Sequence, residues 1–288
     1  MDFMQFAQAH GLIVDHIVAN GRVNYCPTLD HPKKRNGRYM FDGLSGWVMN
    51  WATMEKAAGY RAEKSVVTKI DHTAIARRAA EAERDKRNTQ QKAAYAAKSM
   101  LDECSIATHP YLVAKGLEAI SATVRPNGEL LIPMRDMNSN ALINAQRIAA
   151  PGEKITLRNS EQVGKAFTPG ARPLGAVFKI GRGHEVWLCE GYATAQSLYI
   201  ALRSLKREVS VWACFSAVNM KHVAAHADAR PTFVFADNDV SETGATAAQA
   251  TGLPWAMSPV VGEDANDVAQ RLGVTGLGKL LREFYARQ

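Results

Sequence analysis

Short apolar runs alternate with amphipathic stretches along the C-terminal part of the chain. Some of the runs have the length and composition of buried strands: 185–189, 209–215, 232–236 and 254–259. The stretches that follow them have the period of helices: 192–205, 217–229, 243–251 and 276–286. Apolar strands that alternate with helices are typical of a parallel sheet covered on both faces. We therefore predict an α/β domain over residues 177–288.

The chain upstream of this domain changes character twice. Residues 105–176 are rich in Arg and Lys, and strand patterns at 130–134 and 141–148 predict a basic α/β subdomain. Residues 71–104 are dominated by Ala, Glu, Arg, Lys and Gln and contain no Gly or Pro. This composition has a high helix propensity, so we expect a long polar helix within a linker at 63–104.

Residues 1–62 predict a small β-rich module. Its expected strands and preceding helix are 22–25, 37–41, 46–49 and 2–10. We expect Tyr39, Trp47 and Trp51 to pack a small core. Stacking of these aromatic rings on single-stranded bases is the alternative.

Carboxylates follow directly after two of the apolar runs. Glu190 and Gly191 come after the run at 185–189, and Asp237 and Asp239 come after the run at 232–236. The carboxyl ends of parallel strands meet at one edge of a sheet, where ligands bind. Because hard oxygen ligands favour Mg²⁺ or Mn²⁺, the pattern predicts metal-assisted chemistry on phosphates.

The same residues carry a resemblance to a known family. Leu188–Ser197 and Phe235–Asp239 resemble the two motifs of the Toprim domain, which primases of bacterial type, topoisomerases and some nucleases share. The resemblance implies that Glu190, Asp237 and Asp239 are the catalytic, metal-binding acids.

Further segments resemble the Toprim primases and primase-helicases of phages and plasmids. These segments are Thr108–Gly116, Leu131–Met134, Gln146–Ile148, Ser216–Met220 and Gly262–Val268. The resemblance makes Asp264 and Asp267 candidates for additional metal binding. A helix cap is the competing interpretation for Asp239 and for Asp264.

Four residues are candidates for substrate binding. Gly191 admits a phosphate near the start of the following helix. Arg147 and Lys165 belong to the basic stretch that would hold the phosphates of a template strand. Asn219 lies in one of the segments that resemble the phage and plasmid primases.

The resemblance implies a DNA primase that makes RNA primers from NTPs on a single-stranded DNA template. A Toprim nuclease or DNA-processing factor of a mobile element is the first alternative, and a DNA-binding accessory with a relict site is the second. No phosphate-binding motif of helicases appears in the sequence, so a replicative helicase would be a separate chain.

Charge, apolar runs and cysteines indicate which partner, cellular location and metal to expect. The net charge of +7 is compatible with a polyanionic partner. No apolar run is long enough to span a membrane, so a cytoplasmic location is the default expectation. Only Cys26 and His31 resemble zinc ligands in the N-terminal module, which predicts no bound zinc. Cys189 and Cys214 lie in apolar runs and are expected in the core.

Overall fold

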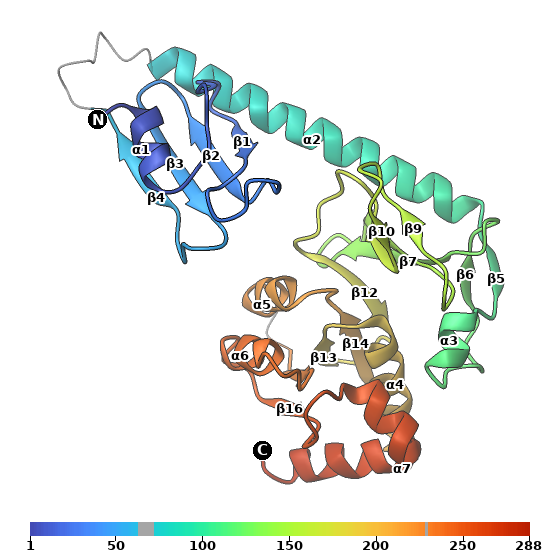
Figure 1. Cartoon of the computed structure of the whole chain (residues 1–288). Helices are drawn as coiled ribbons and strands as arrows, with labels where there is room; N and C mark the ends of the chain where they lie inside the picture. The colour runs from blue at the N-terminus through green and yellow to red at the C-terminus, as the bar shows by residue number, and fades with distance from the viewer. Residues whose placement is uncertain (63–71, 228–229) are drawn as a thin grey trace. The chain divides into compact units, whose positions relative to one another are not determined.

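The chain forms two compact units, Met1–Asn88 and Thr89–Gln288. The computed structural model describes residues 1–62, 72–227 and 230–288 (Figure 1). The first part of the expected linker, residues 63–71, lies outside the described residues, as do the last two residues of the helix expected at 217–229. Within the described ranges, no helix is long and apolar enough to cross a membrane.

The first unit is an antiparallel sheet with a helix on one face. Its elements are α1 (Phe3–Ala9), β1 (Val23–Cys26), β2 (Gly37–Phe41), β3 (Ser45–Asn50) and β4 (Ala58–Arg61), with the strands in sequence order. Asp2 caps α1 by accepting a hydrogen bond from the Gln5 backbone, 2.8 Å away. Phe3 then packs on Tyr39 and Val48 of the sheet.

Two expectations for the first unit need correction. Tyr39 is buried as expected, but Trp51 is 58% exposed and does not join the core. The sequence pattern also missed β4, because its alternation includes Gly59 and only one large apolar side chain, Tyr60.

Helix α2 (His72–Asp102) agrees with the long helix predicted from composition. Its C-terminal part is more than a solvated connection. Ala97 is fully buried and packs on Leu131 and Ala145 of the second unit.

The second unit is built on a ten-stranded mixed sheet. Its first elements are β5 (Ser105–Ala107), α3 (Pro110–Ala114), β6 (Ala122–Val124), β7 (Leu130–Asp136), β8 (Leu142–Ile148) and β11 (Lys165–Phe167). A hairpin of β9 (Ile155–Thr156) and β10 (Gln162–Val163) is separate from this sheet. The remaining elements are β12 (Ala176–Ile180), β13 (Glu185–Cys189), α4 (Tyr192–Ser204), β14 (Val209–Ala213), α5 (Ala217–Ala225), β15 (Thr232–Ala236), α6 (Thr243–Gln249), β16 (Trp255–Met257) and α7 (Ala265–Tyr285).

The strands of the second unit follow the order β11-β8-β7-β12-β14-β13-β15-β16, with β6 beside β7 and β5 beside β6. The last four strands in this order are parallel, which confirms the expected parallel arrangement. Strand β12, which the sequence pattern missed, runs antiparallel to both β7 and β14. It therefore joins the basic segment and the C-terminal strands into one sheet.

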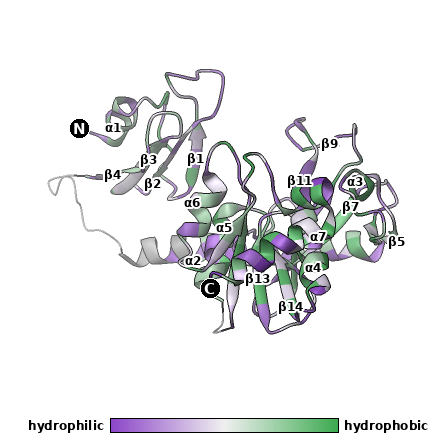
Figure 2. Ribbon diagram, turned by 90° about the horizontal axis from the view of Figure 1, so that it is seen from below, coloured by the Kyte–Doolittle hydropathy of each residue, from purple (hydrophilic) through white to green (hydrophobic). Residues whose placement is uncertain are grey.

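Helices cover both faces of the parallel strands, as predicted. Helices α4 and α7 pack on Trp187 and Phe235, whereas α5 and α6 pack on Leu188 and Val234 of the other face. Cys189 and Cys214 are fully buried, as expected. In Figure 2 hydrophobic residues concentrate on strands such as β13 and β14.

The last helix begins earlier than predicted. Helix α7 starts at Ala265 rather than near 276, and it is kinked at Gly273, where φ is 70°. This glycine and the nearby Gly276 and Gly278 interrupt the helical pattern, which hid the first half of the helix.

Candidate active site at the carboxyl edge of the parallel strands

Glu190 and Gly191 form the turn between β13 and α4. The Glu190 carbonyl accepts a hydrogen bond from the Phe215 backbone, 2.8 Å away, which ties the ends of β13 and β14 together. Gly191 is the N-cap of α4 with an extended backbone, φ −93° and ψ 152°. A Cβ there would lie 2.9 Å from Oγ1 of Thr194, so the position favours glycine because of crowding rather than backbone conformation.

The Glu190 carboxyl group is surrounded by opposing influences. Burial raises its pKa, and so does the negative charge of Asp239. The charge of Lys165 and a hydrogen bond from the Ala217 backbone act in the other direction. The net pKa is raised, which suits a group that accepts a proton near neutral pH.

Asp237 has the least favourable surroundings of the acids in the site. It follows β15 directly, and its Oδ1 is buried with no hydrogen-bond partner among the described residues. Burial raises the pKa of Asp237 to about 7, and neighbouring acids add to the shift: Asp264, Glu190, Asp239 and Asp267. Four carboxylates therefore lie close enough to disfavour its ionisation.

Asp239 points toward the start of α6. Its Oδ1 accepts hydrogen bonds from the Ser241 hydroxyl at 2.7 Å and from the Thr243 backbone at 3.0 Å. The hydrogen bond from Ser241 is the largest cause of the lowered pKa of Asp239. The side chain thus binds the first backbone N–H of α6, although the N-cap residue itself is Glu242, whose side chain makes no capping hydrogen bond.

Asp264 and Asp267 form the capping box of α7. Asp264 accepts hydrogen bonds from the backbones of Asn266 and Asp267, and the Asp267 side chain accepts one from the Asp264 backbone at 3.1 Å. Asp264 also accepts a hydrogen bond from the Thr194 hydroxyl at 2.9 Å, which links α7 to α4 beside Gly191. These two residues therefore cap α7 and also lie close enough to Asp237 to raise its pKa.

Two residues that the sequence analysis overlooked hold this edge together. The Asn238 side chain donates to the Ser258 carbonyl at 3.0 Å, and its backbone N–H bonds to Glu263 at 3.1 Å, which fixes the loop before Asp264. Gly244 packs directly against the backbone carbonyl of Asp237, where a Cβ would clash. The middle position of the Asp-Asn-Asp motif was the available signal for Asn238.

Two lysines face the acids. Lys165 is exposed as a residue, but its ammonium group is crowded: burial and Lys115 lower its pKa, whereas Asp264, Asp237 and Glu190 act to raise it. The Lys165 ammonium lies 5.3 Å from the centre of the Tyr111 ring, and Lys115 lies 3.6 Å from Asp267. The ring centre of Phe167, on β11 with Lys165, lies 6.2 Å from that of Phe215 at the end of β14, so β11 reaches this edge, and the charges of Lys165 and the acids influence one another. Lys115 lies in the segment Thr108–Gly116 but was not singled out.

Arg147 and Asn219 have other surroundings. Arg147 is only 17% exposed and pairs with Glu129 at 3.6 Å, on the wall of a pocket of about 740 Å³ that Lys165 and Phe167 also line. Asn219 is buried, and its amide makes three hydrogen bonds to backbone groups of Gly175, Ala176 and Cys214. We therefore assign Asn219 a structural role.

The donor set of the site fits a hard divalent cation. Among the described residues, no three His, Cys, Asp or Glu side chains converge to form a ready metal site. The best candidates for metal ligands are the Glu190 carboxylate and the unpartnered Oδ1 of Asp237, both oxygen donors of the kind Mg²⁺ prefers. Asp239 could join them through Oδ2 while its Oδ1 keeps the hydrogen bonds to Ser241 and Thr243.

Residues 185–274 match the Toprim domain family. The match runs from β13 into α7 and contains the edge acids: Glu190, Asp237, Asp239, Asp264 and Asp267. The chain thus carries a Toprim domain, a class that binds Mg²⁺ through acidic residues and acts on DNA. The domain fits primases, related nucleases and other DNA-processing enzymes. The grouping with phage and plasmid primases remains a prediction.

Proposed function

We propose that the protein is a DNA primase, which joins NTPs into short RNA primers on a single-stranded DNA template. The observation that carries the proposal is the buried, unpartnered carboxylate of Asp237 within a group of acids that Lys165 faces from β11. The acids of the C-terminal domain and the Lys165 ammonium of the preceding segment would thus border one binding site. A nucleoside triphosphate has the complementary chemistry, because its phosphates bind both metal ions and lysine.

Glu190 and Asp237 would hold the Mg²⁺ or Mn²⁺ ion, and Asp239 would add its second carboxylate oxygen while Oδ1 stays bonded to Ser241 and Thr243. When bound, the ion supplies positive charge to the phosphates of the incoming nucleotide. Lys165 and Lys115 add charge from the opposite side of the site and orient the phosphate oxygens.

The reaction that this arrangement supports is nucleotidyl transfer. The 3′-hydroxyl oxygen of one nucleotide forms a bond to the α-phosphorus of the next, and the bond from that phosphorus to pyrophosphate breaks. The proton of the attacking hydroxyl group would pass to a carboxylate of the site, for which Glu190 is the candidate. Charge at Lys165 stabilises the negative charge that moves onto the leaving pyrophosphate.

Basic residues beside the site give the template strand a place. Arg158 and Lys165 line the same pocket as Arg147, next to the exposed ring of Phe167. Arg147 shares its charge with Glu129 and Lys165 is assigned to the nucleotide, so we propose that Arg158 makes the stronger contact with a template phosphate.

Primer synthesis tests the proposal directly. Labelled NTPs are incubated with varied single-stranded DNA templates and Mg²⁺ or Mn²⁺, and products are resolved on a gel. We expect template-dependent oligonucleotides from the wild type and none from Asp237→Asn. Glu208→Gln is the matched control, because Glu208 is an exposed acid at the opposite edge of the same strands. DNA cleavage without NTPs would replace the primase by a nuclease, and DNA binding without any turnover would leave a binding accessory.

A further inference from the structure

The sheet of the first unit has two apolar faces, but α1 covers only one. The covered face carries Cys26, Tyr39, Phe41, Val48 and Tyr60, which pack with α1. Cross-strand pairing places the other set together on the open face: Val23, Tyr25, Arg38, Met40, Trp47 and Met49. Val23 and Tyr25 are exposed there, whereas Met49 is buried and the others are partly buried. Because an open sheet face is normally polar, this second set requires an explanation.

The most exposed part of the open face is an aromatic pair with a cation between its rings. The Arg38 guanidinium lies 5.0 Å from the centre of the Tyr25 ring and 5.1 Å from that of Trp51. Tyr25 is 53% exposed and Trp51 is 58% exposed. The stacked guanidinium holds both rings in place, and its Nε is buried with no hydrogen-bond partner among the described residues.

A basic turn adjoins this aromatic pair. Lys33, Lys34 and Arg35 lie in the turn before β2 and are exposed. The carbonyl of Asn36, the next residue, accepts a hydrogen bond from the Trp51 backbone at 3.2 Å. The turn and Trp51 are therefore attached, and positive charge lies next to the exposed rings.

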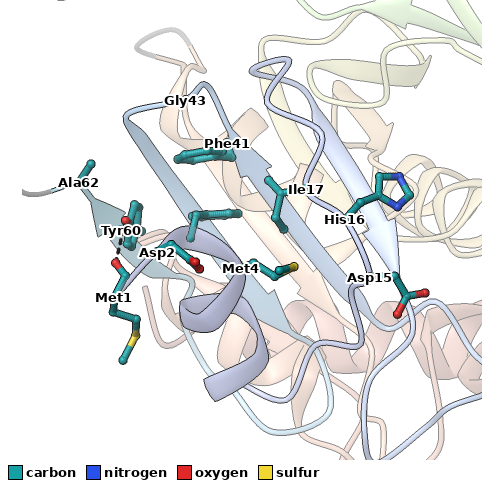
Figure 3. A pocket seen from close by; sticks show the side chains of 11 residues that line it. Met1, Asp2, Met4, Asp15, His16, Ile17, Phe41, Gly43, Tyr60 and Ala62 are labelled. Carbon is teal, nitrogen blue, oxygen red and sulfur yellow. Dashed lines mark hydrogen bonds between the residues drawn. The ribbon is translucent and has the colours of Figure 1, made fainter. Parts of the chain in front are cut away.

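The side of the sheet that α1 covers has the opposite character. A pocket of about 680 Å³ lies there. Figure 3 shows side chains that line it, among them Phe41, Met4, Ile17, Asp2 and Asp15. The residues that line this pocket include no Lys or Arg. Of the two faces of this sheet, as far as the structure describes them, the open face is the one that combines exposed aromatic rings with positive charge.

We propose that the open face of the first unit binds single-stranded nucleic acid. Unpaired bases stack on Tyr25 and Trp51, and the backbone phosphates lie along Arg38 and the turn at 33–35. A duplex fits poorly, because its bases are already stacked on each other. The surface needs no metal ion, and the inference stands whether or not the Toprim site makes primers.

Binding of labelled oligothymidylate to the full chain, measured by fluorescence anisotropy, tests the surface. We expect Tyr25→Ala and Trp51→Ala each to weaken binding about fivefold to a hundredfold, the usual effect of removing one stacking ring. Trp51→Phe should restore most of the affinity. Tyr95→Ala is the matched control, since Tyr95 is 77% exposed on α2 and should be dispensable.

Two further measurements separate stacking from charge. Replacing Lys33, Lys34 and Arg35 by Ala should reduce the slope of log affinity against log salt by about 2, the value for three phosphate contacts on a single strand. Cross-links from 5-bromouracil in the oligonucleotide should fall on Tyr25 or Trp51. Circular dichroism checks that each variant is folded, which the exposed positions of both rings make the expected result.

The proposal fails if the folded Tyr25→Ala and Trp51→Ala variants bind as well as Tyr95→Ala. It fails equally if a duplex of the same length or polyglutamate competes as well as the single strand, because charge alone would then explain binding. Asp237→Asn should bind oligothymidylate like the wild type, so loss of primer synthesis and loss of this surface give different results.

Discussion

Asp237→Asn changes one atom of the side chain and removes its charge. In the folded protein the pKa of Asp237 is about 7, compared with an ordinary value of 3.8. Between these two pH values the folded state holds a proton that the unfolded chain has lost. The free energy of unfolding therefore falls as the pH rises from about 4 to about 7.

The size of this effect follows from the two pKa values. Ionised Asp237 destabilises the fold by up to about 4 kcal/mol at pH 8. Asparagine cannot ionise, but its amide also lacks a partner in the buried site, which costs about 1–2 kcal/mol. We expect a net gain of about 2 kcal/mol for Asp237→Asn at pH 8, or roughly 4–8 °C in melting temperature for a unit of this size. At pH 4 only the cost of the unpartnered amide remains, so the variant should be about 1–2 kcal/mol less stable than the wild type.

Melting curves at several pH values, with and without Mg²⁺, measure both parts of the argument. At pH 8, Mg²⁺ should stabilise the wild type by binding its folded state. It should leave the melting temperature of Asp237→Asn unchanged, and the turnover of this variant should stay near zero. Loss of the metal-binding charge should lower the rate of phosphoryl transfer about a hundredfold or more. A variant that is less stable than the wild type at pH 8, yet active, would refute the assignment of Asp237.

Further variants test the neighbouring assignments. Lys165→Met should lower the rate of primer synthesis about tenfold to a hundredfold with an unchanged melting temperature, and Lys165→Arg should recover part of the rate; equal rates for both variants and the wild type would exclude Lys165 from the site. Asn219→Ala should lose about 2–4 kcal/mol in urea unfolding, because it leaves buried backbone groups without partners, while the folded fraction stays active; loss of activity at full stability would instead indicate a substrate contact. Elemental analysis should find no stoichiometric zinc, since only Cys26 and His31 resemble ligands, and one tightly held zinc ion per chain would show that other residues bind it.

The sequence predicted the parallel strands of the C-terminal domain from their apolar runs, but it missed β4 and β12. Strands β13 and β15 match their predicted ranges because every side chain in each run is buried or partly buried. Strand β14 ends earlier than its apolar run because Phe215 adopts a left-handed backbone, φ 65°, that turns the chain into α5. A local apolar pattern does not show such a turn, since phenylalanine rarely adopts this conformation.

The part of the candidate site that could be predicted is the part that follows from the parallel direction of the strands. The acids after β13 and β15 had to meet because both strands are parallel neighbours in the sheet. Nothing local to Lys165 shows that β11, at the other end of the sheet, brings its side chain to those acids. The intervening strand β12 runs antiparallel and was not visible in the pattern, so the path from the basic segment to the site could not be traced.

Asp239 shows why the sequence left capping and catalysis as open alternatives. Its Oδ1 binds Ser241 and Thr243 at the start of α6, while its charge also raises the pKa of Glu190 and Asp237. Asp239 can take part in the site and in the start of α6, because the loop after β15 leads directly into α6. Because a carboxylate has two oxygens, the hydrogen bonds at Oδ1 do not exclude a cation at Oδ2. A cation bound there would draw charge away from the hydrogen bonds that begin α6, which couples the occupancy of the site to the order of the first helical turn.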